Sequence, residues 1–356
     1  MTSTLAPARP APPCPDTVRP VDTAAHAHAE GRDPWLDTAK MALVTLVVVG
    51  HAWGALPDTP LNRWLHDFLY LWHVPALVML TGYLSRSFRW TRPQLSRLAR
   101  TVVAPYVVGE LAVAAFRIGV RGQGLDRAVA DPHWPLWFLV ALALWRLAAP
   151  LLRSPAGLTV AVVVSLAGGL ADAELLDLSR VLGLLPFFVL GLVARREHLV
   201  LLRRTGARTA AVAVLAAAGW LSAAADRPTV TEWLYWRSGY AELGVTVAEG
   251  VATRAGLLGV AGVVAVAFLA LVPGRDGWFS RLGAASLVVY LGHGVVVKAF
   301  EYAGPSAWLA THPVAGLLVA TAGALLLAVT LAAPPVAARL EVLVDPVGLL
   351  LRRRRR

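Results

Sequence analysis

Long apolar runs separated by short charged intervals fill the chain from residue 34 onward. A helix crosses a bilayer with roughly 20 apolar residues, enough for roughly 30 Å of hydrocarbon, and satisfies its own backbone hydrogen bonds there. Ten runs approach this length, at about residues 39–57, 65–85, 102–118, 134–152, 156–171, 181–195, 207–225, 255–272, 282–302 and 314–338. The pattern predicts an all-α fold, a polytopic transmembrane helical bundle of about ten spans. The fifth and sixth runs are short and contain Gly or Pro, which suits tilted spans or a re-entrant pair.

The two ends of the chain differ from this pattern. Residues 1–33 are rich in Pro, Ala and Thr and hold few large apolar side chains, so they predict a disordered tail. Residues 341–356 end in the run Arg352–Arg356, which predicts a basic tail that touches anionic lipid headgroups or anchors the topology. Between them, residues 34–340 are expected to form one membrane domain of ten helices.

The amino-acid composition supports a chain that is embedded in a membrane. It is 57% hydrophobic and 15% charged, whereas a soluble domain carries about 25% charged residues. The net charge is +11, but the basic residues lie at the ends of apolar runs, so membrane lipid rather than nucleic acid is the expected partner. Cys14 is the only cysteine, which excludes an intramolecular disulfide and a multi-cysteine metal site, and no metal is expected.

The distribution of basic residues predicts the orientation. With the N-terminus inside the cell, most of the 33 basic residues fall in inner loops, as the positive-inside rule requires. We therefore expect a multi-pass protein of the plasma membrane with both ends in the cytoplasm. The long outer segment 226–254 carries aromatic and acidic residues, which suit either a carbohydrate-receiving surface or a folded cap.

The first apolar run contains two ionisable side chains, Lys40 and His51. Ionisable groups inside a span are costly and mark function by default. A separation of 11 residues corresponds to about 16 Å of helix and an offset of about 20°, so both side chains lie on one face. The expected helix carries a cation at its cytoplasmic edge and an imidazole well into the membrane. Asp37 is expected to pair with Lys40 or to cap the helix.

The second run contains His73 two residues before Pro75. If the first two spans are antiparallel neighbours, His51 and His73 lie at comparable depth. Pro75 frees a backbone carbonyl beside His73 and makes room for a ligand. A packing histidine bonded to a neighbour's carbonyl is the equally weighted alternative.

Arg97 and Arg100 follow the second run and share one helix face, because they are three residues apart. A guanidinium pair at the inner membrane edge suits phosphate binding. Taken alone, the pair is better explained as positive-inside anchoring.

Two more buried ionisable groups are expected in later spans. Glu110 needs a partner from another helix, and it could orient a histidine or pair with Arg117 or Arg146. His293 lies in the ninth run, where packing is favoured over catalysis.

Several short motifs occur in a characteristic order along residues 34–300. They are Asp37-Thr38-Ala39-Lys40 with ten residues before His51, Trp72-His73-Val74-Pro75 before Thr81-Gly82-Tyr83, Arg97-x-x-Arg100 before Pro105-Tyr106, Trp134-Pro135-Leu136-Trp137-Phe138-Leu139, Leu185-Pro186-Phe187-Phe188 and Tyr290-Leu291-Gly292-His293-Gly294. In this order and spacing, the chain resembles the bacterial membrane acyltransferase 3 family, on its fucose 4-O-acetylase-like branch. One departure is Thr81, where that family usually has Ser.

The resemblance implies transfer of an acyl group, commonly acetyl, from cytoplasmic acyl-CoA to a hydroxyl of a glycan or related acceptor, with no bound cofactor. It assigns His51 as general base or transient acyl carrier, and His73 as an oxyanion or acceptor ligand. Lys40, Arg97 and Arg100 are expected to hold the CoA phosphates, with Asp37, Glu110 and His293 in supporting roles.

Two other functions fit intramembrane ionisable residues. A proton- or ion-coupled secondary transporter or flippase would use them as a relay, but such proteins are often built from inverted repeats. No motif in the second half corresponds to the Lys40–His51 pattern, which lowers this reading. A non-catalytic membrane scaffold ranks last, because it needs no histidine within a span.

Overall fold

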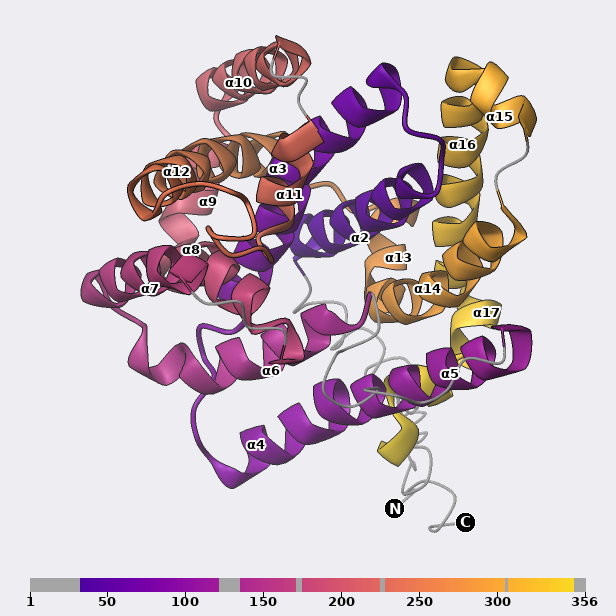
Figure 1. Cartoon of the computed structure of the whole chain (residues 1–356). Helices are drawn as coiled ribbons and strands as arrows, with labels where there is room; N and C mark the ends of the chain where they lie inside the picture. Colours follow the sequence, from indigo (N-terminus) through magenta and orange to yellow (C-terminus); the bar gives the residue numbers. More distant parts are fainter. Residues whose placement is uncertain (1–32, 122–134, 171–174, 225–227, 305–306, 349–356) are drawn as a thin grey trace, which may run out of the picture. The chain divides into compact units, whose positions relative to one another are not determined.

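The structure is a computed structural model that describes residues 33–121, 135–170, 175–224, 228–304 and 307–348. The chain divides into two units, Met1–Asp33 and Pro34–Arg356. The predicted tail 1–33 lies outside the described residues except for Asp33, so the description below concerns the second unit. Within the described residues all regular structure is helical, which confirms the predicted all-α class (Figure 1).

Most of the described residues belong to helices. In chain order they are Pro34–Gly54 (α2), Pro60–Leu84 (α3), Arg92–Leu98 (α4), Ala104–Arg121 (α5), Trp137–Ala148 (α6), Pro155–Ala167 (α7), Leu178–Val193 (α8), Arg196–Leu202 (α9), Thr205–Ala224 (α10), Pro228–Tyr235 (α11), Val247–Leu271 (α12), Trp278–Leu282 (α13), Ser286–Ala303 (α14), Ala307–Thr311 (α15), Pro313–Ala332 (α16), Pro334–Arg339 (α17) and Glu341–Val344 (α18). A π-helical turn, Ala99–Val103 (η1), joins α4 to α5, so that one helix of 29 residues runs over Arg92–Val120.

Six helices are long and apolar enough to cross a membrane: Pro34–Gly54, Arg92–Val120, Thr205–Ala224, Val247–Leu271, Trp278–Ala303 and Pro313–Ala332. The pair α8 and α9 passes the same test only as a unit bent by 97°. Each of the ten predicted runs coincides with a helix, but the count of about ten spans is not confirmed. Helices α6 and α7 are short, and α3 carries Asn62, Arg63, His66 and Asp67 near its start.

Helices α2 and α3 pack against each other, and α2 also contacts α13, α14 and α16. The turn between α2 and α3 ends at Thr59, whose hydroxyl accepts a hydrogen bond from the backbone N–H of Asn62 at 3.2 Å and so caps α3. We call this turn the His51 end of the pair. The opposite end, where α2 begins and α3 finishes, is the Lys40 end.

Helices α3 and α8 approach each other with their backbones nearly in contact. Gly82 of α3 faces the carbonyl oxygen of Phe188, and Gly191 of α8 faces that of Met79. A Cβ atom at either glycine would overlap the facing carbonyl. Glycine at both positions therefore lets this helix pair pack without an intervening side-chain layer.

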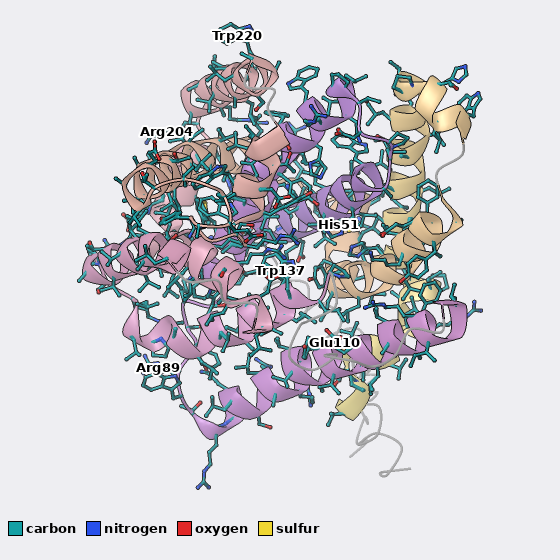
Figure 2. The ribbon with its side chains drawn as sticks, viewed as in Figure 1. His51, Arg89, Glu110, Trp137, Arg204 and Trp220 are labelled. Atoms are coloured by element: carbon teal, nitrogen blue, oxygen red, sulfur yellow. The ribbon has the colours of Figure 1, made fainter. Side chains whose placement is uncertain are left out.

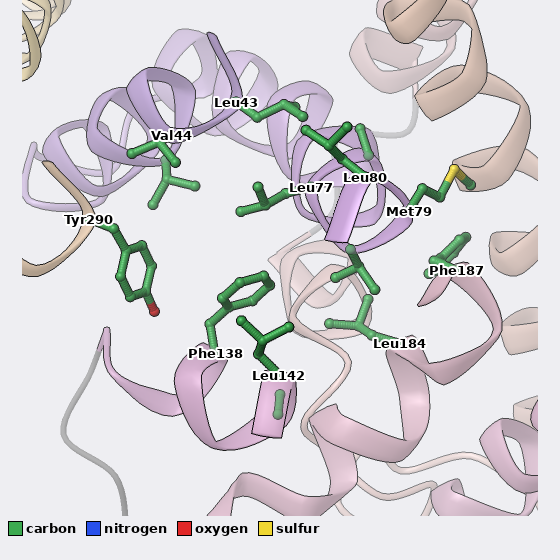
Figure 3. Close-up of a cluster of buried hydrophobic side chains, with 14 of the residues drawn as sticks. Leu43, Val44, Leu77, Met79, Leu80, Phe138, Leu142, Leu184, Phe187 and Tyr290 are labelled. Carbon is green, nitrogen blue, oxygen red and sulfur yellow. The ribbon is translucent and has the colours of Figure 1, made fainter. Parts of the chain in front are cut away.

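A layer of buried apolar side chains fills the space between α2, α3, α6 and α8. Figure 3 shows Val44, Leu77, Phe138, Leu142 and Leu184 converging on it, each less than a tenth exposed. Along α2, Val44 lies between Lys40 and His51. The layer therefore separates the His51 end from the Lys40 end.

The segment after α11 folds as a cap over the ends of α7 and α12. Arg254 of α12 is 2% exposed and donates hydrogen bonds to the carbonyl oxygens of Ser165, at 3.2 Å, and Ser238, at 3.0 Å. The Tyr240 hydroxyl donates to the carbonyl of Leu166 at 2.8 Å. These bonds hold the part of the segment around Ser238 and Tyr240 against α7 and α12.

Candidate active site

A pocket of about 370 Å³ lies at the His51 end, where α2 finishes and α3 begins. Residues of α2, α3, α6, α8, α11 and α14, and of the segments that follow α2 and α11, surround it. They are His51, Gly54, Ala55, His66, Tyr70, Val74, Trp137, Arg180, Leu184, Leu234, Tyr235, Trp236, Arg237, Lys298 and Glu301. Gly54, Arg237 and Glu301 are exposed and form its rim. Figure 2 labels His51 near the end of α2, and Trp137 at the start of α6.

His51 lies in the last turn of α2, because that helix begins five residues earlier and ends three residues earlier than the sequence pattern indicates. Its Nδ1 atom lies 2.9 Å from Nε2 of His293, and the two rings stack with centroids 5.1 Å apart. The structure therefore pairs His51 with His293, for which the sequence favoured packing over catalysis.

The hydrogen bonds of His293 determine which nitrogen of His51 can accept a proton. His293 is fully buried, and its Nδ1 atom lies 3.1 Å from the carbonyl oxygen of Val289. A carbonyl only accepts, so Nδ1 of His293 carries the hydrogen and Nε2 of the neutral ring has a lone pair. That lone pair accepts the Nδ1–H of His51. The neutral His51 ring then has its own lone pair on Nε2, which makes Nε2 the basic atom.

Arg180 forms one wall of the pocket. Its Nη1 atom lies 2.6 Å from a carboxylate oxygen of Asp177, three residues earlier, and its Nε donates to the carbonyl of Tyr235 at 3.0 Å. The guanidinium carbon lies 4.6 Å from the centre of the Trp137 ring. Arg180 is thus held in a fixed position by a carboxylate, a carbonyl and an aromatic face.

The other two cations of the pocket are also near carboxylates. Nζ of Lys298 lies 2.7 Å from Glu301, and the Arg237 guanidinium lies 3.7 Å from Glu232. The pocket therefore presents both donors and acceptors, and its positive charge is balanced locally.

Aromatic rings supply most of the remaining surface. The rings of His66 and Tyr70 stack with centroids 4.1 Å apart, and Tyr70 meets Tyr235 edge-on at 5.3 Å. Burial, with the nearby carboxylates of Glu232 and Asp67, raises the pKa of Tyr235. The Tyr235 phenol therefore stays protonated at neutral pH and can donate a hydrogen bond.

Comparison with known protein families matches residues 33–333, most of the chain, to a family described as an acyltransferase domain. The chain belongs to the acyltransferase 3 family. Neither the curated proteins nor the solved structures contain a significant match. The family supports a membrane acyltransferase, consistent with the apolar helices of the fold.

His73 of this acyltransferase lies just behind the pocket. It is 1% exposed, its ring is 4.7 Å from that of Tyr70, and its Nδ1 atom lies 2.7 Å from the carbonyl of Leu69. Nδ1 therefore carries the hydrogen, and the buried Nε2 has no hydrogen-bond partner within the described ranges. In this form Nε2 accepts hydrogen bonds and does not donate them.

The predicted donor-binding residues lie away from the pocket, at the Lys40 end. Lys40 pairs with Asp37 at 2.7 Å, as expected. Arg97 and Arg100 are exposed on the helix that begins at α4, and Arg100 lies 3.4 Å from Asp345. About 16 Å of α2 separates Lys40 from His51. The structure thus brings Asp37 to Lys40 but does not bring these cations to the imidazole pair.

Glu110 is buried on α5, at 8% exposure, and does not line the pocket. The hydropathy pattern and the motifs did not indicate His66, Tyr70 or Arg180 as site residues. Arg180 begins a long apolar run three residues after Asp177, and this i,i+3 pair is the one signal that could have identified it. Helices α3, α8 and α11 meet at this pocket through tertiary packing, which no local sequence pattern indicates.

Proposed function

We propose that this protein is an integral-membrane O-acyltransferase that moves an acyl group, acetyl in the simplest case, from acyl-CoA to a hydroxyl of a glycan or related acceptor. The observation that carries the proposal is the His51–His293 pair in the wall of an aromatic pocket, in a chain of the acyltransferase 3 family. The fucose 4-O-acetylase-like branch remains part of this proposal.

His51 acts as the general base. A hydroxyl is a weak nucleophile at neutral pH, and a positioned imidazole removes its proton as it reacts. The acceptor hydroxyl gives its proton to Nε2 of His51 while its oxygen bonds to the thioester carbonyl carbon. The C–S bond then breaks, and the thiolate leaves with the proton that the imidazolium returns. His293 holds His51 in the tautomer that has its lone pair on Nε2.

The lining of the pocket favours a neutral, hydroxyl-rich acceptor. Paired charges such as Arg180 with Asp177 offer hydrogen-bond donors and acceptors without a net charge that would select an ion. Tyr235 and Trp137 offer flat apolar faces, on which a sugar ring can lie. The volume of about 370 Å³ falls in the range of small-molecule sites. His73 lies behind this lining, and its Nε2 accepts hydrogen bonds rather than donating them, so it does not suit an oxyanion.

The donor approaches from the Lys40 end, where Lys40, Arg97 and Arg100 are the proposed phosphate ligands. With the N-terminus in the cytoplasm of a plasma-membrane protein, this end faces inward and the His51 pocket faces outward. The apolar layer between the two ends must then part for the acyl thioester to reach His51. In this proposal the acyl group crosses the membrane before it reaches the acceptor.

The proposal is tested with purified protein in lipid nanodiscs and radiolabelled acetyl-CoA, measuring transfer to a panel of glycan and polyol acceptors. Replacing His51 by Gln removes the base, and we expect transfer to fall about 10²- to 10⁴-fold. The matched control is His312→Gln, because His312 is an exposed histidine that does not line the pocket. Full activity of the His51 variant would refute the base assignment. Ion-coupled uptake into vesicles without acyl transfer would favour the transporter alternative.

A further inference from the structure

A second group of cations lies at the Lys40 end, formed by two segments that are distant in sequence. Arg86 and Arg89 follow the end of α3, whereas Arg146 and Arg153 lie at and just after the end of α6. The indole N–H of Trp90 donates to the carbonyl of Leu147 at 2.8 Å and ties the two segments together. Figure 2 labels Arg89 beside this part of the molecule.

Arg146 is fixed by one neutral contact. Its Nε donates to the hydroxyl of Ser85 at 3.2 Å, and that hydroxyl donates in turn to the carbonyl of Thr81 at 2.7 Å. Ser85 is 2% exposed. The end of α3 therefore holds the Arg146 guanidinium in position but leaves its charge without compensation.

Arg153 lacks partners more completely. Its Nε and Nη2 atoms are enclosed and have no hydrogen-bond partner among the described residues. Burial, and secondarily the charge of Arg89, lowers the pKa of the Arg153 guanidinium. None of Arg86, Arg89, Arg146 and Arg153 contacts a carboxylate in the part of the chain that the structure describes.

Membrane anchoring alone does not account for this arrangement. An anchoring arginine extends its guanidinium into water or headgroups, where its hydrogen bonds are satisfied. Enclosed guanidinium N–H groups without acceptors are costly unless an anion binds them. Arg153, with the charge of Arg89 acting on it, is therefore suited to an anion such as a phosphate.

We propose that Arg146 and Arg153, assisted by Arg89, bind a phosphate group of the acyl-CoA donor, in addition to the ligands Lys40, Arg97 and Arg100 proposed above. This inference rests on the proposed function and adds a donor subsite to it. Helix α6 gives the geometric link, because Trp137 lines the His51 pocket and Arg146 follows nine residues later on the same helix. That separation is about 14 Å of helix. A donor anchored at Arg146 and Arg153 extends its acyl end along α6 toward the pocket.

Lipid headgroups also carry phosphate, and the test separates the two sources. Full-length protein is purified in a phosphate-free, non-ionic detergent, and equilibrium binding is measured for CoA, 3′-dephospho-CoA and vesicles of phosphatidylglycerol. We expect Arg153→Gln and Arg146→Gln each to weaken CoA binding about tenfold or more, the value of one charge-assisted hydrogen bond. The matched control is Arg275→Gln, an exposed arginine in the loop after α12, which we expect to leave CoA binding unchanged.

A conservative substitution of Arg153 distinguishes a loss of binding from a loss of folding. Arg153→Lys keeps the charge but loses the planar fork, so its CoA affinity should lie between those of the wild type and Arg153→Gln. Unchanged CoA affinity in both glutamine variants would overturn the subsite and leave the proposed function standing. CoA binding that depends on Arg153, without any acyl transfer, would sustain the subsite while the proposed function fails. Vesicle binding that depends on Arg153, with no binding of CoA, would assign the site to lipid and overturn the proposal.

Discussion

The cations that line the His51 pocket and the arginines beside the end of α3 lie in opposite electrostatic settings. At the His51 end, Arg180, Lys298 and Arg237 each lie near a carboxylate. At the Lys40 end, Lys40 pairs with Asp37 and Arg100 lies near Asp345, but Arg146 and Arg153 have no such partner within the described residues. A pocket with balanced charges selects a neutral polar molecule, whereas arginines without carboxylate partners favour an anion. The contrast assigns the acceptor to the first and the phosphates of the donor to the second.

The largest remaining effect is expected from the partner of the base. His293→Leu removes the acceptor of the His51 Nδ1–H bond, so His51 loses its fixed tautomer. Loss of a group that orients a functional imidazole costs about 10- to 100-fold in activity. We expect the fall in kcat, with little change in the KM for acetyl-CoA. His293→Gln, whose side-chain oxygen can accept the same bond, should recover part of the activity. Equal losses in both variants would indicate a purely structural role.

A smaller effect is expected from a double substitution in the His51 pocket, which tests whether donor and acceptor bind at separate ends. Arg180→Met together with Asp177→Leu removes a charge pair from the pocket without leaving an unpartnered carboxylate. We expect the KM for the acceptor to rise about tenfold, because charge-assisted contacts are lost, while CoA affinity stays unchanged. Arg153→Gln should show the converse pattern. If both variants weakened CoA binding equally, the assignment of separate ends to donor and acceptor would be wrong.

The smallest effect is expected from salt. The Debye length is about 10 Å at 0.1 M salt and falls as the ionic strength rises. Raising the ionic strength from about 0.05 to about 0.5 M should therefore weaken CoA binding a few-fold. The KM for a neutral acceptor should not follow, because each cation of its pocket has a nearby carboxylate. Steady-state kinetics with each substrate varied in turn measures both. A KM for the acceptor that rises in parallel with the Kd for CoA would contradict this charge assignment.

The sequence predicted the helical class and the alignment of Lys40 with His51, because both depend on local periodicity. It placed His51 deeper in its helix than the structure does, because an apolar run does not define where a helix ends. Thr59 and Pro60, which begin α3, mark that boundary more closely.

The partners of His51 could not be predicted in the same way. His293 is 242 residues away in sequence, and the hydrogen bond between the two depends on how α14 packs on α2. Arg146 and Arg153 resembled ordinary inner-loop arginines, since charge counting does not reveal which guanidinium groups lack acceptors. Each of these features is set by contacts between helices, which hydropathy does not encode.

The glycine contact between α3 and α8 limits how the interior can open. Because Gly82 and Gly191 each face a backbone carbonyl, those two helices can shift past one another only by breaking that contact. Helix α6 meets its neighbours through side chains such as Phe138 and Leu142, which can change rotamer. A passage from Arg153 to His51 would therefore open beside α6, with α3 and α8 moving as one rigid unit.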